Sequence, residues 1–185
     1  VALAPYCLRC SCAAGFPRPL TSCSLRFRYG YFVQAPDLPL DWVVDACRDT
    51  ECSVYGWIQP FLQDHSGHGG AAEHAYPTAE HVRGTACNYW HKGVDGLYAF
   101  FAKWPHGDVE RAWLGELGQP DLMLSRTKRY RLPSRPEDGG HSAYHGRMLP
   151  LDIATTGAEQ HVRFSVADDL WGDAGVRARS VTLTV

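Results

Sequence analysis

Two short apolar segments decide the fold: CSVYGWI at residues 52–58 and VDGLYAFF at residues 94–101. Each has the length and the β-branched and aromatic content of a strand. Between them, TAEHVRGTACNYWHK at residues 78–92 begins with a capping threonine and ends at Gly93, which is the pattern of a helix. A strand, a helix and a second strand in this order predict two parallel strands joined by a crossover helix.

The same alternation extends to either side of this unit. PLDWVVDACRD at residues 39–49 and VERAWLGEL at residues 109–117 have apolar residues at helical spacing, and Gly118 with Pro120 closes the second helix. RYGYFV at residues 28–33 is the one strand-like stretch of an otherwise irregular N-terminal segment. Neither GxGxxG nor GxxxxGK[ST] follows a predicted strand, so nucleotide-binding α/β folds gain no support.

The last third of the chain has a different character. Residues 131–147 are rich in proline and glycine, which predicts loops. Residues 149–153, 161–166 and 179–185 then alternate apolar with polar side chains, as half-buried antiparallel strands do. We expect a small β-sandwich-like domain here.

Composition narrows the classes of function. The net charge is −2, so no basic surface for nucleic acid is expected, and no apolar run approaches the roughly 20 residues that span a bilayer. Six tryptophans and nine tyrosines suit either sugar stacking or an ordinary core. The seven cysteines form no disulfide framework, which favours a reducing, cytoplasmic compartment over secretion.

One stretch resembles a known family. NYWHKGVDGLYAFF at residues 88–101 is similar to the final helix and strand of bacterial glycosyl hydrolase-like barrel proteins, and LGELGQPD at 114–121 with KRY at 128–130 is similar to the helix and link that leave that barrel. The sequence departs from the family pattern at Phe101-Ala102, where a polar residue such as Asn is expected after the strand.

The resemblance implies an incomplete (β/α)8 barrel. Residues 28–33, 52–58 and 94–101 would be its sixth, seventh and eighth strands, whereas a whole barrel needs eight strands and about 250 residues. The expected organisation is an irregular segment at 1–35, the last two or three βα units of a barrel at 36–130, and the β-rich domain at 131–185. Such a fragment of a glycoside hydrolase would not be active alone without the missing barrel half or an oligomeric partner.

Candidate site residues follow from the resemblance, because the active sites of such barrels lie at the C-terminal ends of the strands. Glycosidic hydrolysis uses two carboxyl groups, so Glu73 is the first candidate for a catalytic carboxylate and Asp64 the second, with a solvated loop acid as the alternative. No cofactor is implied. The residues expected to bind the carbohydrate are Trp57, Gln59, His65, Tyr76 and Trp104.

Two other functions remain open. The second hypothesis, after the glycoside-hydrolase fragment, is a non-catalytic carbohydrate-binding or structural remnant. A metal-dependent hydrolase is the other alternative, because Asp64, His65, His68 and His74 lie within eleven residues and imidazole and carboxylate groups bind zinc. The CxxCxC at residues 7–12 is a conceivable metal knuckle, but it lacks the second ligand pair of a structural zinc site.

Overall fold

A computed structural model gives the fold. It describes the backbone of the first strand together with the following residues: 34, 36–59, 62, 76–99, 106–131, 161, 164–170 and 180–183. Of the predicted elements, the strands at residues 28–33 and 149–153 lie outside these ranges.

The centre of the molecule is a three-stranded parallel sheet. Its strands are β1 (Cys23–Phe27), β2 (Cys52–Ile58) and β3 (Gly96–Ala99), in the order β1-β2-β3. In the β2–β3 register, Tyr55 lies opposite Gly96 and Ile58 opposite Ala99. The expectation that the segments near residues 55 and 97 are parallel neighbours is therefore confirmed.

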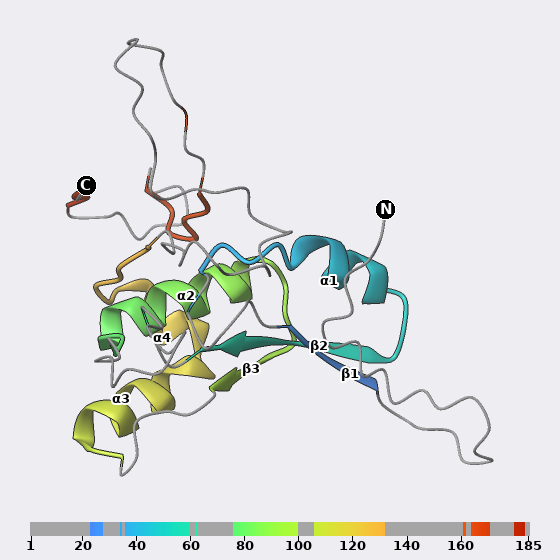
Figure 1. Cartoon of the computed structure of the whole chain (residues 1–185), viewed down its shortest axis with the longest axis horizontal. Coiled ribbons are helices and arrows are strands. Elements are labelled where there is room, and N and C mark those ends of the chain that lie inside the picture. Colours follow the sequence, from blue (N-terminus) through green and yellow to red (C-terminus); the bar gives the residue numbers. More distant parts are fainter. Residues whose placement is uncertain are drawn as a thin grey trace, which may run out of the picture.

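Four helices accompany the strands: the first three follow the order that the sequence pattern predicts, and the fourth is not predicted. They are α1 (Asp41–Cys47), α2 (Ala79–His91), α3 (Asp108–Leu117) and α4 (Pro120–Leu124). Helices α1 and α2 pack on the same face of the sheet, and α3 and α4 pack against α2 (Figure 1). The ion pair between Arg83 of α2 and Glu116 of α3, at 2.6 Å, joins two of these helices.

The core lies between β2 and α2. Val54 and Ile58 face the helices, where Val82, Ala86 and Tyr89 are almost completely buried. Because side chains alternate along a strand, Gly56 shares this face with Val54 and Ile58. A Cβ atom at Gly56 would lie 2.5 Å from the ring of Tyr89, so only glycine lets this ring lie against the strand.

The barrel prediction is wrong. The described residues form an open sheet of three strands with five, seven and four residues, and nothing in this part of the chain closes it into a barrel. Closure requires a complete ring of tilted, staggered strands, which so short a sheet cannot provide. The protein has a small α/β fold in which helices cover the sheet.

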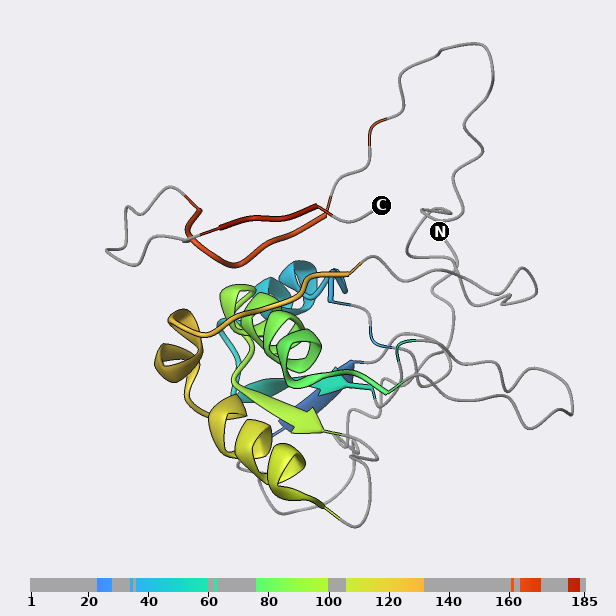
Figure 2. The same ribbon diagram turned by 90° about the vertical axis from the view of Figure 1, so that its left-hand side faces the viewer.

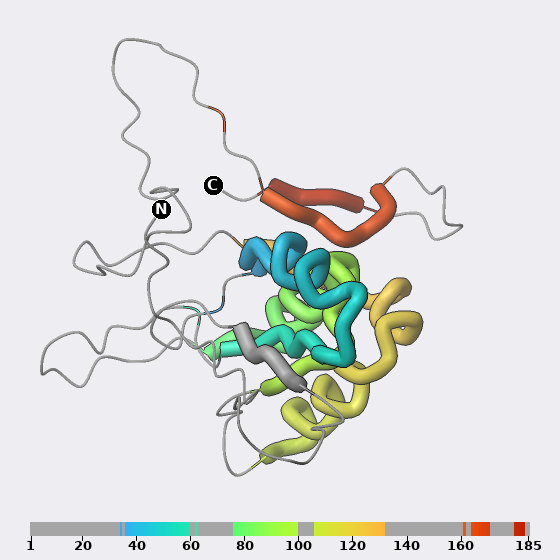
Figure 3. Tube along the Cα trace, turned by 90° about the vertical axis from the view of Figure 1, so that its right-hand side faces the viewer, coloured from blue at the N-terminus to red at the C-terminus, as the bar shows by residue number. Residues whose placement is uncertain are grey.

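The predicted β-sandwich is also wrong for the described part of the tail. Residues 164–170 and 180–183 lie side by side above the helices (Figures 2 and 3), but they form no strand. The side chain of Asn88 supplies the physical reason: its Nδ2 donates to the carbonyl of Ser165 at 2.8 Å, and its Oδ1 accepts from the amide of Ala167 at 2.8 Å. The segment thus bonds to a helix side chain where a strand would bond to a neighbouring strand.

Candidate functional site at the C-terminal edge of the sheet

The predicted site residues divide into two groups. Trp57, Gln59 and Tyr76 belong to the described residues, and they lie at the end of β2 or just before α2. The C-terminal ends of parallel strands share one edge of a sheet, so these three residues belong to the same edge. The remaining candidates lie outside the described residues: Asp64, His65, His68, Glu73, His74 and Trp104.

An aromatic pair occupies the sheet face opposite α1 and α2. Trp57 and Tyr98 are register partners on β2 and β3, and their rings meet edge to face with centroids 5.1 Å apart. Trp57 is half-buried, while 39% of Tyr98 remains exposed. Tyr55 lies on the same face, where its ring covers Gly96. The pair therefore presents an aromatic surface near the C-terminal edge.

Gln59 directly follows β2 and is only 2% exposed. Neither its Oε1 nor its Nε2 has a hydrogen-bond partner. Nearly all buried polar side chains in proteins are hydrogen-bonded, because an unmade bond leaves the cost of desolvation uncompensated. Gln59 lies two residues beyond Trp57, the spacing at which side chains of an extended chain share a face. Its amide is therefore an unused donor and acceptor at the C-terminal end of β2.

Tyr76 precedes the start of α2 and is 48% exposed. Thr78 is the N-cap of this helix, and its backbone N–H donates to Nδ1 of His81 at 3.3 Å. This capping arrangement determines where α2 begins. It therefore places Tyr76 at the C-terminal edge of the sheet, the edge near which the aromatic pair lies. Of the three described candidates, Trp57 and Gln59 are two residues apart at the end of β2. Tyr76 lies two residues before the N-cap of α2, the helix that follows β2 in the chain.

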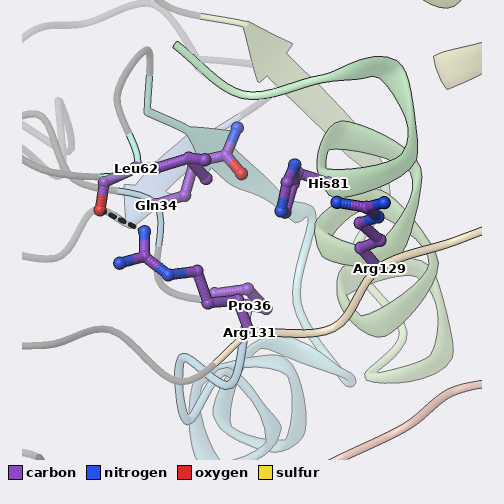
Figure 4. A pocket seen from close by; sticks show the side chains of 6 residues that line it. All are labelled: Gln34, Pro36, Leu62, His81, Arg129 and Arg131. Atoms are coloured by element: carbon purple, nitrogen blue, oxygen red, sulfur yellow. Dashed lines mark hydrogen bonds between the residues drawn. The ribbon is translucent and has the colours of Figure 1, made fainter. Parts of the chain in front are cut away.

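Sequence reasoning missed a second group of polar residues at this edge. A narrow hollow there is lined by Gln34, Pro36, Leu62, His81, Arg129 and Arg131 (Figure 4). These residues come from the loop after β1, the loop after β2, the first turn of α2 and the segment after α4. The one local signal is the basic run KRYR at residues 128–131.

Burial and charge alter the ionisation of His81 in this hollow. Burial is the main cause of its lowered pKa, and the nearby charges of Arg129 and Arg131 lower this pKa further. Glu80 acts in the opposite direction on the His81 pKa. Burial also lowers the pKa of Arg131. The imidazole is therefore the neutral species at pH 7.

The motif residues behind the family resemblance hold the fold together. Asn88 is 1% exposed, and besides its contacts with the tail it donates to the carbonyl of Pro36 at 3.0 Å. The indole Nε1 of Trp90 donates to the carbonyl of Leu117 at 2.9 Å. Asp95 fixes the β2–β3 register, since its Oδ2 accepts from the amide of Val54 at 2.7 Å. These residues stabilise the fold through hydrogen bonds that connect its elements.

Two structural findings bear on the other functions. In the ranges that the structure describes, no group of three His, Cys, Asp or Glu side chains is arranged to hold a metal ion, and Asp64, His65, His68 and His74 lie outside these ranges. Within the same ranges, no helix combines the length and apolar character needed to cross a membrane.

No protein-family model matches the sequence, and no curated protein matches it significantly.

Proposed function

We propose that the protein binds a carbohydrate at the C-terminal edge of its sheet. The rings of Tyr98 and Trp57 provide the stacking surface, and the amide of Gln59 provides a donor and an acceptor for sugar hydroxyls. Tyr76, exposed at the start of α2, extends the aromatic surface along the edge.

The amide of Gln59 is the observation that carries this proposal. It is a buried group with one donor end and one acceptor end, and both ends lack a protein partner. A sugar hydroxyl donates one hydrogen bond and accepts others, so neighbouring hydroxyls of one ring match the two ends of an amide. Because the amide is almost completely buried, sugar binding requires it to become accessible.

The aromatic pair supports the same ligand class. Aromatic rings bind the apolar C–H face of a sugar, and the polar tips of Trp and Tyr tolerate the water around its hydroxyls. The edge-to-face packing of Trp57 on Tyr98 fixes the two rings relative to each other, which lowers the entropy cost of binding. The exposed part of Tyr98 is the point of first contact for the ligand.

We propose carbohydrate binding only. Cleavage of a glycosidic bond is tested separately. Glycosidic hydrolysis needs two carboxyl groups roughly 5 to 10 Å apart. Asp64 and Glu73, the carboxylates that the sequence nominates, lie outside the described residues. The test below therefore measures binding and bond cleavage independently.

Isothermal titration with gluco-, xylo- and chito-oligosaccharides tests the proposal. At least one series should bind saturably to the wild-type chain. Tyr98→Ala should weaken that binding about tenfold, which corresponds to about 1.4 kcal/mol. Trp42→Ala removes an aromatic side chain of similar exposure from α1, and its binding should stay within twofold of wild type.

Two results would overturn the proposal: no saturable binding of any of the three series, or equal affinities of wild type and Tyr98→Ala. Release of reducing sugar during the same incubations would show that the chain also cleaves its ligand.

A further inference from the structure

The narrow hollow at the C-terminal edge collects hydrogen-bond donors. Gln34, His81, Arg129 and Arg131 all carry side-chain N–H groups, and none of the lining residues described has a carboxylate. Figure 4 shows the amide of Gln34 between Leu62 and His81, with Arg131 beside Leu62 and Arg129 beyond His81. Side chains from four separate parts of the chain thus converge on one small space.

Neither Arg129 nor Arg131 has a carboxylate in direct contact within the described ranges, although seven ion pairs are present there. Arg131 donates through Nη1 to the backbone carbonyl of Leu62, which holds its guanidinium at the hollow without neutralising it. Glu80 is the nearby carboxylate. The hydrogen bond from the Thr78 side chain is the main cause of its lowered pKa, with Arg83 and Arg129 as smaller contributions.

Gln34 adds a buried donor that has no acceptor. The side chain is 4% exposed, and its Oε1 accepts from the hydroxyl of Thr85 at 3.2 Å. The Thr85 hydroxyl also lies 3.1 Å from the carbonyl of His81, and Nε2 of Gln34 has no hydrogen-bond partner. A buried N–H without an acceptor is rare in native proteins, and this one belongs to a hollow that two arginines also line, a setting that suits an anionic ligand.

His81 and the N-terminal end of α2 also favour an anionic ligand. Nδ1 of His81 accepts from the backbone N–H of Thr78, so the proton of the neutral ring lies on Nε2, where it is available as a further donor. His81 lies in the first turn of α2, whose thirteen residues direct the positive end of the helix dipole to this point.

Gly84 brings Arg129 to the hollow. A Cβ atom at Gly84 would lie 2.4 Å from the backbone oxygen of Arg129, so only glycine lets the segment after α4 lie directly against α2. The backbone N–H of Arg129 donates to the carbonyl of Glu80 at 2.9 Å. Because Glu80 directly precedes His81 in α2, this bond holds the segment after α4 close to His81. The basic cluster is therefore positioned by the backbone.

We propose that this hollow is a binding site for a small oxyanion, a phosphate or carboxylate group held by Arg129, Arg131, His81 and Gln34. The guanidinium groups make paired hydrogen bonds with such oxygens. With the side chains as they lie, the hollow is too tight for a water molecule, so the proposal requires the lining to open as the anion enters. Arg129 is the exposed arginine of the lining and is therefore the side chain that would move. This site is independent of the proposed sugar binding.

The test compares anions and variants. Sodium phosphate and sodium acetate are titrated at constant ionic strength, with NMR detection of the His81 imidazole. Saturation by phosphate alone assigns a phosphate site, and saturation by acetate alone assigns a carboxylate site. In either case the pKa of His81 should rise on binding, because the anion stabilises the protonated ring.

Variants separate a built site from general surface charge. Arg129→Met should weaken binding at least tenfold, and Arg129→Lys should fall between it and wild type, because lysine keeps the charge without the paired donors. Arg111→Met removes one exposed charge from α3, and its affinity should remain within twofold of wild type. The proposal fails if neither anion binds saturably, or if Arg129→Met and Arg111→Met bind equally well.

Discussion

Replacing Gln59 by methionine should make the protein more stable. The side chain is 2% exposed and neither end of its amide is hydrogen-bonded, so the folded state bears the desolvation cost of the amide without compensation. An unsatisfied buried polar group costs about 1–3 kcal/mol. Methionine has a similar length, no polar hydrogen-bonding requirement and a flexible side chain that fits irregular space. We expect the free energy of unfolding to rise by about 1–3 kcal/mol.

Urea unfolding followed by circular dichroism measures this change. For a chain of this size, 1 kcal/mol corresponds to a shift of about 2–4 °C in Tm, so thermal melts give a second measure. Gln119→Met is the matched control. Gln119 is exposed and donates only a long bond of 3.4 Å to Gly115, so we expect a change within about 0.5 kcal/mol.

The same variant should lose affinity for the oligosaccharide that the wild type binds. A gain in stability with a loss of binding is the usual signature of a polar group kept for a ligand. If Gln59→Met instead lowers the free energy of unfolding by more than about 1 kcal/mol, the amide has a structural partner and the reasoning is refuted.

Three further predictions concern the framework around the edge. Asn88→Ala removes the bonds to the carbonyls of Pro36 and Ser165 and to the amide of Ala167, so the free energy of unfolding should fall by about 3 kcal/mol. The Ala167 amide should then exchange with solvent more than tenfold faster, and unchanged exchange would show that Asn88 does not hold the tail. Asp95→Ala leaves the Val54 amide without its acceptor and should cost about 1.5 kcal/mol in urea unfolding, whereas Asp45→Ala, on the exposed face of α1, should cost less than about 0.5 kcal/mol. Because folding lowers the pKa of His81, the unfolded chain binds this proton more tightly; the stability that His81 contributes should be complete above about pH 6.5 and be lost as the pH falls toward the lowered value. His81→Asn should therefore show a shallower loss of stability between pH 7.5 and pH 5.5 than wild type, and identical slopes would contradict the assignment.

Local patterns were sufficient to predict the elements of the α/β core. The aromatic and β-branched run at residues 52–58 matches β2 residue for residue, and the threonine before α2 and Gly93 after it mark the ends of that helix. Gly93 has a φ of +86°, the left-handed conformation that favours glycine after a helix. These signals depend on neighbouring residues, so they can be read without knowing the fold.

Boundaries were misjudged where two signals competed. Pro120 was interpreted as a stop after α3, but proline is also favoured at the first position of a helix, and α4 begins there. The strand predicted at the aromatic run 28–33 lies outside the described residues, and the strand that pairs with β2 is β1, Cys23–Phe27, where no strand was predicted. Its pairing with β2 requires a match along the neighbouring strand, which no local pattern encodes.

The tail and the hollow could not be predicted because both depend on distant contacts. Alternation predicts half-buried strands at 161–166 and 179–185 with Val181 and Leu183 on one face, yet these two residues are 70% and 76% exposed. Asn88, 77 residues earlier in the chain than Ser165, determines where that segment lies. Likewise, Gln34 and Arg129 are far apart in the sequence. They line the same hollow because each bonds to α2, Gln34 to Thr85 and Arg129 to the carbonyl of Glu80.

The indole N–H resonance of Trp57 offers the most direct measurement of the central claim. Trp57→Phe assigns this resonance among the six tryptophans, and Trp42 serves as the internal reference. With the oligosaccharide that binds best, the Trp57 resonance should shift saturably in wild type, and the Trp42 resonance should stay in place. A Trp57 resonance that does not move, or that moves no more than that of Trp42, would contradict sugar binding at this edge.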